Sequence, residues 1–169
     1  MEQLGDIVVR KAAPQDCPDA DRLNALVLRR HHEALPHIFK PSQTAPVWAD
    51  AKFADEQLLL TVAEADGAVV GLLEAICFDP PPEVIEHLAS SPVHLRRVAF
   101  IQNIVAEPQG RGIGTALLEF AEAWAISRGA EAIELGSSAF NTQAHAFYGA
   151  HGFEPLSIMF SKRLADPQA

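Results

Sequence analysis

Apolar residues recur with two different periods along the chain, and the period decides which element each stretch predicts. Alternating or continuous apolar runs bounded by glycine, proline or aspartate predict strands. The strands expected on this basis span residues 6–10, 57–65, 68–78, 97–106, 131–137 and 153–164. Apolar spacings of three and four residues predict helices over about 20–35, 115–128 and 142–150, with short helical pieces within 47–56 and 83–88.

Turn and capping residues indicate how these elements connect. Asp66-Gly67 joins two apolar runs and tolerates positive φ, which predicts a hairpin. Pro36 ends the first long helix, and Gly129 is the expected C-terminal stop of the second. The order is strand, helices, hairpin, then strand–helix–strand–helix–strand. We therefore expect an α/β fold of the α+β sandwich type, with a mixed central sheet flanked by helices.

Length and composition are those of an ordinary globular protein. The chain has 169 residues, so residues 1–169 are expected to form a single domain. Hydrophobic residues make up 49% and charged residues 21%, which excludes a disordered chain. The formal net charge of -9 disfavours non-specific binding to nucleic acid or to an anionic membrane. An acidic balance suits a cationic small substrate, but it also serves solubility alone.

The sequence carries no predicted targeting or membrane segment. Its first residues, MEQLGDIVVRKAAPQD, include early acidic side chains and no long apolar run, unlike a signal peptide. No stretch approaches the ~20 apolar residues of a membrane span. Cys17 and Cys77 lie far apart without C-x-x-C spacing, which suggests neither a disulfide framework nor a zinc site. We expect a protein of the reducing cytoplasm.

The stretch QGRGIGT, residues 109–115, is the clearest candidate for anion binding. A dinucleotide fingerprint, G-x-G-x-x-G, fits at Gly110 and Gly112 but fails at Thr115. A Walker loop needs a lysine that is absent here. A plain strand-to-helix turn is the simplest alternative, but three glycines would be a costly way to build one. The remaining pattern is Q-x-x-G-x-G, formed by Gln109, Gly112 and Gly114.

A second motif, NTQAHAFYGAHGF, follows at residues 141–153. The two motifs, in this order and spacing, resemble the GCN5-related N-acetyltransferase (GNAT) family. That family binds acetyl-coenzyme A through a Q/R-x-x-G-x-G/A loop and carries an N-x-x-A-x-x-F-Y-x-x-x-G-F signature. The stretch AEADGAVVGLLEA resembles the central hairpin of the family, and the likeness covers about residues 6–164.

The resemblance implies a GNAT-like fold and acetyl-coenzyme A as co-substrate, with no metal. Backbone N–H groups of the glycine loop and helix start would bind the pyrophosphate. The pantetheine arm would pair like an extra strand with the end of the fourth strand. The implied cofactor-binding residues are Ile104, Val105, Ala106, Gln109, Gly110, Arg111, Gly112, Ile113, Gly114, Thr115, Asn141 and Tyr148.

Tyr148 is the only tyrosine in the chain and stands at the tyrosine position of the second motif. The resemblance implies that its hydroxyl protonates the leaving thiolate as a general acid. Packing of a helix-face aromatic in the core is the alternative, although Phe147 suits that role better. Asn141 can cap its helix, contact the cofactor, or do both.

The general base is harder to identify from the sequence. Relatives often carry a carboxylate on the fourth strand, but here Gln102 and Asn103 are amides and cannot act as bases near pH 7. Glu74 on the neighbouring hairpin strand is the substitute assignment, and a surface glutamate is the competing interpretation. A water relayed through backbone groups, or an amine needing little help, would also serve. The short spacer before Gln109 departs from the family pattern too.

The segment RRHHEALPHIFKP, residues 29–41, suggests an acceptor wall. A similar segment in some acetyltransferases lines the acceptor site, which makes Glu33, Phe39 and Trp48 candidate acceptor contacts, with a core role for the aromatics equally open. Gln102 is also assigned to acceptor binding. The adjacent His31 and His32 lack i+4 partners, so metal binding is not expected.

The expected activity is transfer of an acetyl group from acetyl-coenzyme A to a primary amine by direct attack on the thioester. A non-catalytic acyl-coenzyme A-binding module is the main alternative, and a structural α/β protein is a third. The acceptor can be a small molecule or a peptide amine. Relatives often dimerise, so a homodimer is possible; nucleic acid and membrane partners are not expected.

Overall fold

The computed structural model describes residues 5–40, 46–79 and 97–162. Contacts divide the chain into two compact units, Met1–Gly136 and Ser137–Ala169, which are described separately below. A single domain over residues 1–169 stays a prediction. The predicted helical piece at 83–88 lies outside the described residues.

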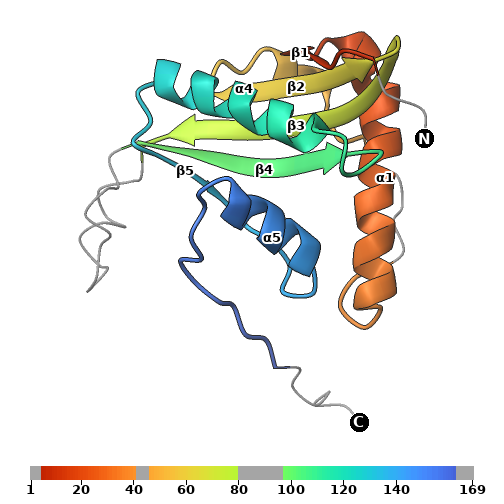
Figure 1. The fold of residues 1–169 in the computed structure, drawn as a ribbon, viewed down its shortest axis with the longest axis vertical. Helices are drawn as coiled ribbons and strands as arrows, with labels where there is room; N and C mark the ends of the chain where they lie inside the picture. The colour runs from red at the N-terminus through yellow and green to blue at the C-terminus, as the bar shows by residue number, and fades with distance from the viewer. Residues whose placement is uncertain (1–4, 41–45, 80–96, 163–169) are drawn as a thin grey trace. The chain divides into compact units, whose positions relative to one another are not determined.

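The first unit is built on a five-stranded sheet (Figure 1). Its strands, in spatial as well as chain order, are β1 (Val8–Lys11), β2 (Leu58–Ala65), β3 (Ala68–Phe78), β4 (Val98–Ala106) and β5 (Ala132–Leu135). The first three pairings are antiparallel, and β4 pairs with β5 in parallel. The expected mixed, mostly antiparallel sheet flanked by helices is confirmed.

The helices follow the predicted periodicity with small shifts at their ends. They are the 3-10 turn η1 (Pro14–Asp16), α1 (Cys17–Ala34), α2 (Asp50–Phe53), α4 (Ile113–Ser127) and, in the second unit, α5 (Thr142–Ala150). Helix α1 starts earlier than expected because Pro18 stands in its first turn, where no N–H donor is needed. Helix α2 keeps only four residues of the predicted 47–56 segment.

Helices α1 and α4 pack on opposite faces of the sheet. Neighbouring residues of a strand point to opposite faces, and β3 shows both. Leu72 lies in a buried cluster with Leu23 of α1, whereas Gly71 faces Ile113 of α4. In Figure 1, α4 runs across the face of β2 and β3 that is turned to the viewer.

Two register shifts interrupt the ladders of β3. Between β2 and β3 the pairs Ala63–Gly71 and Glu64–Val69 leave Val70 as an extra residue. Between β3 and β4 the partners of Glu74 and Ala75 are Asn103 and Ile101, which leaves out Gln102. Bulges of this kind redirect side chains and often lie next to active sites.

The predicted strand over 153–164 is wrong over its described part, residues 153–162. No strand forms there, and Leu156, Ile158, Met159 and Phe160 are 76%, 75%, 95% and 89% exposed. The alternating pattern of this segment resembles a strand, but a strand exists only where its backbone groups find a partner. No such pairing is present among the described residues.

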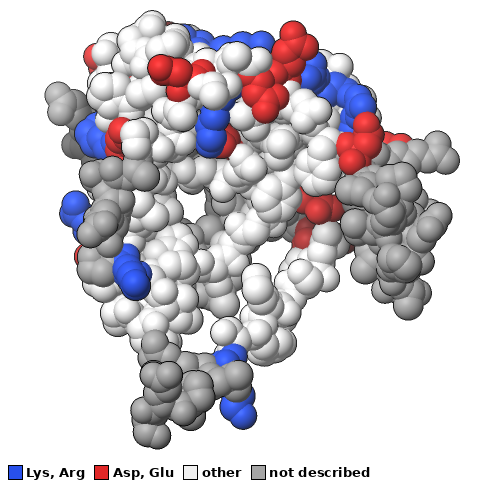
Figure 2. Space-filling model, turned by 180° about the vertical axis from the view of Figure 1, so that it is seen from behind, with Lys and Arg blue, Asp and Glu red and all other residues white. Residues whose placement is uncertain are grey.

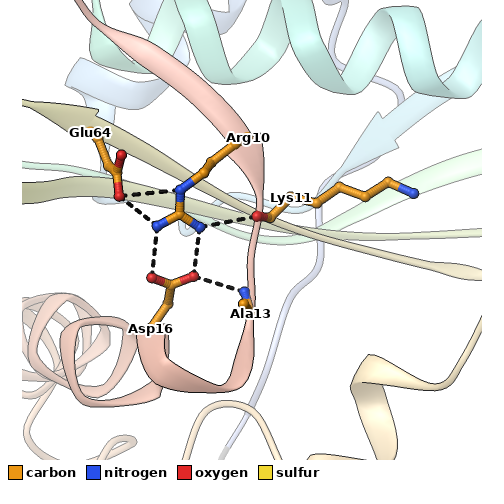
Figure 3. A network of polar contacts seen from close by, with 5 residues as sticks. All are labelled: Arg10, Lys11, Ala13, Asp16 and Glu64. Carbon is orange, nitrogen blue, oxygen red and sulfur yellow. Dashed lines mark hydrogen bonds and ion pairs between the residues drawn. The ribbon is translucent and has the colours of Figure 1, made fainter.

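A polar network joins β1, η1 and β2 (Figure 3). The Arg10 guanidinium donates to both oxygens of Asp16, at 2.8 and 2.9 Å, and to Oε1 of Glu64 at 2.5 Å. Asp16 is only 4% exposed and also accepts a hydrogen bond from the backbone N–H of Ala13. The hydrogen bonds from Arg10, aided by Ala13, hold the pKa of the Asp16 carboxyl below its usual value against the opposing effect of burial.

Surface charges of both signs occur on the face shown in Figure 2, where acidic and basic side chains alternate along the upper rim. Within the described ranges, the longest helices are either too short or too polar to cross a bilayer.

Candidate active site

The glycine loop connects β4 to α4 through two residues in left-handed conformation. Gly110 and Gly112 have φ of 72° and 81°, which an L side chain rarely adopts. Gly112 is the N-cap of α4, so the helix starts at Ile113, two residues before the predicted start. A Cβ built on Gly110 would meet no atom within 4 Å, so open space adjoins the loop.

The first turn of α4 presents backbone N–H groups at its N-terminal end. The N–H of Ala116 donates to the carbonyl of Gly112 at 3.0 Å and closes that turn. The amides before it have no acceptor within the helix, as at every α-helix start. Together with the helix dipole, they favour an anion at this position.

Strand β4 has one open edge where it approaches the loop. Its pairing with β5 ends at Ile101 and Leu135, while its pairing with β3 continues to Ala106. Between residues 102 and 106, no described strand lies against the other edge. Ile104, Val105 and Ala106 therefore lie on a strand segment with an unpaired edge, as the resemblance requires for a pantetheine arm. Val105 itself is 5% exposed.

Glu74 lies on the α1 side of the sheet in a buried polar contact. Its carboxylate accepts a hydrogen bond from Nε1 of Trp48 at 3.0 Å and from Nζ of Lys52 at 2.5 Å. Glu74 is 4% exposed and Trp48 is 2% exposed. The structure thus places the predicted acceptor contact Trp48 within the core, and it places Glu74 where both oxygens already have donors.

The bulge in β4 brings amide side chains to the same region. Asn103 is directly opposite Glu74 in the ladder, and its Nδ2 donates to Oδ1 of Asn24 on α1 at 3.1 Å. Gln102, the extra residue of the bulge, is exposed. The α1-facing side of β4 therefore offers amide groups next to the point where its edge becomes open.

The end of α1 lies near the glycine loop. Arg30 forms an ion pair with Glu107, the residue that follows β4, at 3.3 Å. Phe39 packs edge-on against the ring of His31, and its carbonyl accepts a hydrogen bond from Nδ1 of His32 at 2.7 Å. Glu33 is exposed on the same helix. The predicted wall is thus assembled from α1 and the turn after it.

In the second unit, Asn141 caps α5. Its side-chain oxygen accepts the backbone N–H of Ala144 at 3.2 Å. Tyr148 is half-buried, with ring centroids 5.4 Å from Phe147 and 5.8 Å from Phe153. Burial raises the pKa of the Tyr148 phenol above its ordinary value of 10.0, so the hydroxyl keeps its proton at neutral pH.

Comparison with known proteins decides the family. The model of the acetyltransferase (GNAT) family matches residues 26–153, which include both motifs. The chain belongs to the GNAT family. Its members' shared chemistry makes this chain an acetyl-coenzyme A-dependent N-acetyltransferase.

Two curated relatives support the assignment. This GNAT enzyme is 29% identical to aminoglycoside N(6')-acetyltransferase type 1 of Stenotrophomonas maltophilia over 73% of its chain and 84% of the relative. It is 30% identical to aminoalkylphosphonate N-acetyltransferase of Salmonella typhimurium over 68% of each chain. Both names describe transfer of an acyl group to an amine.

Solved structures share the fold. The BH1408 protein of Bacillus halodurans superimposes with a TM-score of 0.80 at 22% identity, over 94% of this chain and 99% of that one. The aminoglycoside N-acetyltransferase AAC(6')-Iy, in complex with a coenzyme A bisubstrate analogue, gives 0.65 at 21% identity, over 95% and 100%.

Several residues near the GNAT site carry no signal that sequence reasoning could use. Lys52 and Asn24 contact Glu74 and Asn103 across long separations, and neither belongs to a motif. Gly71 gave no warning beyond being a glycine inside a strand. Within the described ranges, no group of three or more histidine, cysteine or acidic side chains could hold a metal ion.

Proposed function

We propose that this enzyme binds acetyl-coenzyme A along the open edge of β4 and at the start of α4. The pantetheine arm pairs with residues 104–106, and the pyrophosphate meets the amides of residues 110–115. One observation carries this proposal: the unpaired edge of β4 leads directly into a glycine loop that ends at a helix N-terminus. Gln109 and Arg111 flank the phosphates in this arrangement.

In the proposed reaction, the neutral amine of the acceptor attacks the thioester carbonyl carbon. A new C–N bond forms, and the C–S bond breaks as the tetrahedral intermediate collapses. The phenol of Tyr148 donates its proton to the leaving sulfur, and the free thiol of coenzyme A results. Support comes from the motif position of Tyr148 and from the burial that keeps its hydroxyl protonated. Asn141 fixes the start of the helix that carries it.

We assign removal of the amine's proton to water held by backbone groups near the bulge. Glu74 is a less suitable direct base, because Trp48 and Lys52 occupy its carboxylate oxygens. Gln102 and Asn103 can hydrogen-bond an acceptor or a water but cannot take a proton. Glu33 and Phe39 complete the acceptor side of the proposed site.

We further propose that the acceptor is a small molecule with a primary amine. The support is that both curated relatives are named for small acceptors, an aminoglycoside and an aminoalkylphosphonate. A turnover screen with both classes, detecting released thiol, tests this. Acetylation of peptides alone would contradict it, and coenzyme A binding without turnover would favour a binding module.

Two glycines provide a matched test of the cofactor site. Gly110 and Gly67 have φ of 72° and 76°, and a Cβ on either meets no atom within 4 Å. Alanine therefore strains both positions alike. Calorimetry should show weaker acetyl-coenzyme A binding for Gly110→Ala and wild-type binding for Gly67→Ala. Equal affinities in the two variants would refute the proposed placement.

A further inference from the structure

Gly71 lies in the interior of β3, where glycine weakens a strand and is normally avoided. Its φ lies outside the left-handed region, so the backbone conformation alone admits any residue. The absence of a side chain must therefore serve close packing.

A Cβ on Gly71 would collide with three atoms. It would lie 2.7 Å from Cγ2 of Ile113, 3.0 Å from Cδ1 of Leu117 and 3.0 Å from the carbonyl oxygen of Val105. Ile113 and Leu117 are 1% and 0% exposed, so neither side chain has free space to turn into. The third atom is backbone of β4, which cannot move without shifting the strand.

These collisions involve residues on both sides of the glycine loop. Val105 lies just before the loop, and Ile113 is the first residue of α4 after it. The same part of β3 also holds the intervening chain: Gly71 pairs with Ala106, and the carbonyl of Val70 accepts the N–H of Glu107 at 2.9 Å. The bulge at Val70 lies immediately beside this contact.

We propose that Gly71 is a positioning residue for acetyl-coenzyme A binding, and this inference rests on the proposed function. Its bare backbone lets the first turn of α4 sit against β3 and thereby fixes the direction of the amides at residues 110–115. A side chain at this position separates α4 from β4 and misaligns the phosphate and pantetheine contacts together. Gly71 acts through the loop and touches no substrate.

Gly71→Ala tests the proposal. We expect the Kd for acetyl-coenzyme A to rise roughly tenfold or more, because small displacements of binding groups weaken them steeply. The kcat at saturating acetyl-coenzyme A should stay within about twofold, since the reacting groups are unchanged. The KM for the acceptor should not change.

Two control variants separate positioning from general stability. Gly136→Ala is a glycine substitution with ordinary φ and no atom within 4 Å, and it should bind as the wild type does. Leu23→Ala opens the core on the α1 side, where Leu23 is 0% exposed. It should lower the melting temperature at least as much as Gly71→Ala and leave the Kd unchanged.

The contact with Ile113 gives a rescue experiment. Ile113→Ala removes Cγ2, so adding Gly71→Ala to it should raise the Kd much less than Gly71→Ala does alone. If Gly71→Ala does not fold, Ile113→Ala alone should still raise the Kd, because the helix start loses its seat on β3.

The outcomes distinguish this inference from the proposed function. Loss of melting temperature with unchanged Kd in Gly71→Ala would overturn the positioning role, as would an unchanged Kd in Ile113→Ala. A wild-type protein that does not bind acetyl-coenzyme A in calorimetry would instead overturn the proposed site itself.

Discussion

The two sides of the sheet satisfy their polar groups in opposite ways. At the β1–β2 side, the chain satisfies itself: Arg10, Asp16 and Glu64 pair with one another around the start of α1 (Figure 3). At the β4 side, pairing with β5 stops at Ile101, and the strand runs on with one edge open. Since polar groups seek partners, the closed region is a scaffold and the open region is the place for a ligand.

Both regions contain a left-handed glycine at a turn, Gly67 after β2 and Gly110 after β4. Local conformation is therefore the same on the two sides. The difference lies in the element after the turn, which is a paired strand in one case and a helix N-terminus beside an open strand edge in the other. Context, and not the glycine itself, distinguishes the turn from the binding loop.

The largest expected effect separates chemistry from both regions. Tyr148→Phe keeps the ring and removes the acid, so kcat should fall about a hundredfold while the Kd for acetyl-coenzyme A stays near the wild-type value. Burial raises the pKa of the Tyr148 phenol above 10.0, so the wild-type kcat should persist to that pH and decline only beyond it. Steady-state kinetics over pH measure this. An unchanged kcat in the variant would show that Tyr148 is not the acid.

The next effect tests the closed side. Asp16→Asn should lower the free energy of unfolding by about 2 kcal/mol, less than for a fully buried pair because the Arg10 side chain is 34% exposed. The lowered pKa of Asp16 means that its contribution is present above the ordinary carboxyl pKa and is lost as pH falls through the lowered value. Urea titrations at pH 7 and pH 3 measure both effects.

Asp19→Asn is the matched control for this variant. Asp19 pairs with Arg22 on the surface, with side chains 44% and 53% exposed, so its loss should cost less than about 0.5 kcal/mol. Catalytic activity should survive in both variants at temperatures where they are folded. Equal losses of stability would refute the distinction between the buried network and a surface pair.

A smaller effect sharpens the comparison of the two turns. Gly110→Ala should raise the Kd for acetyl-coenzyme A about tenfold, and Gly67→Ala should not, although each should cost about 1 kcal/mol of stability. Calorimetry and urea unfolding on the same samples measure the two quantities. A larger Kd change for Gly67→Ala than for Gly110→Ala would place the ligand on the wrong side of the sheet.

The smallest effect concerns a polar group that the scaffold leaves unsatisfied. Thr61 is 0% exposed in β2, and within the described ranges its hydroxyl has no hydrogen-bond partner. Thr61→Val keeps the shape and removes the hydroxyl, so it should stabilise the protein by about 1 kcal/mol. Thr61→Ser keeps the hydroxyl and loses a methyl group, so thermal unfolding should show a change of the opposite sign.

The sequence predicts the elements well where a period and its boundaries agree. The helix predicted at 115–128 is α4, which occupies Ile113–Ser127, and the shift arises because left-handed Gly112 caps it directly. The hairpin turn at Asp66-Gly67 is confirmed, with φ of 51° and 76°. Residues 153–162 show the limit, since an alternating pattern cannot reveal whether a pairing partner exists.

The site is predictable only where it follows a motif. The glycine loop and the Asn141 cap follow from short-range sequence, because their geometry depends on neighbouring residues. The bulge at Gln102 and the contact between Asn24 and Asn103, 79 residues apart, depend on register and packing. No local pattern encodes them, which is why Glu74 could be named but its two donors could not.

Hydrogen exchange of backbone amides, with and without saturating acetyl-coenzyme A, tests the central claim most directly. The full chain would be measured by mass spectrometry under conditions where calorimetry shows binding. We predict slower exchange at residues 104–106 and 113–115 and unchanged exchange at residues 8–11 on the closed side. Bound acetyl-coenzyme A with no protection at residues 104–106 and 113–115 would contradict the account.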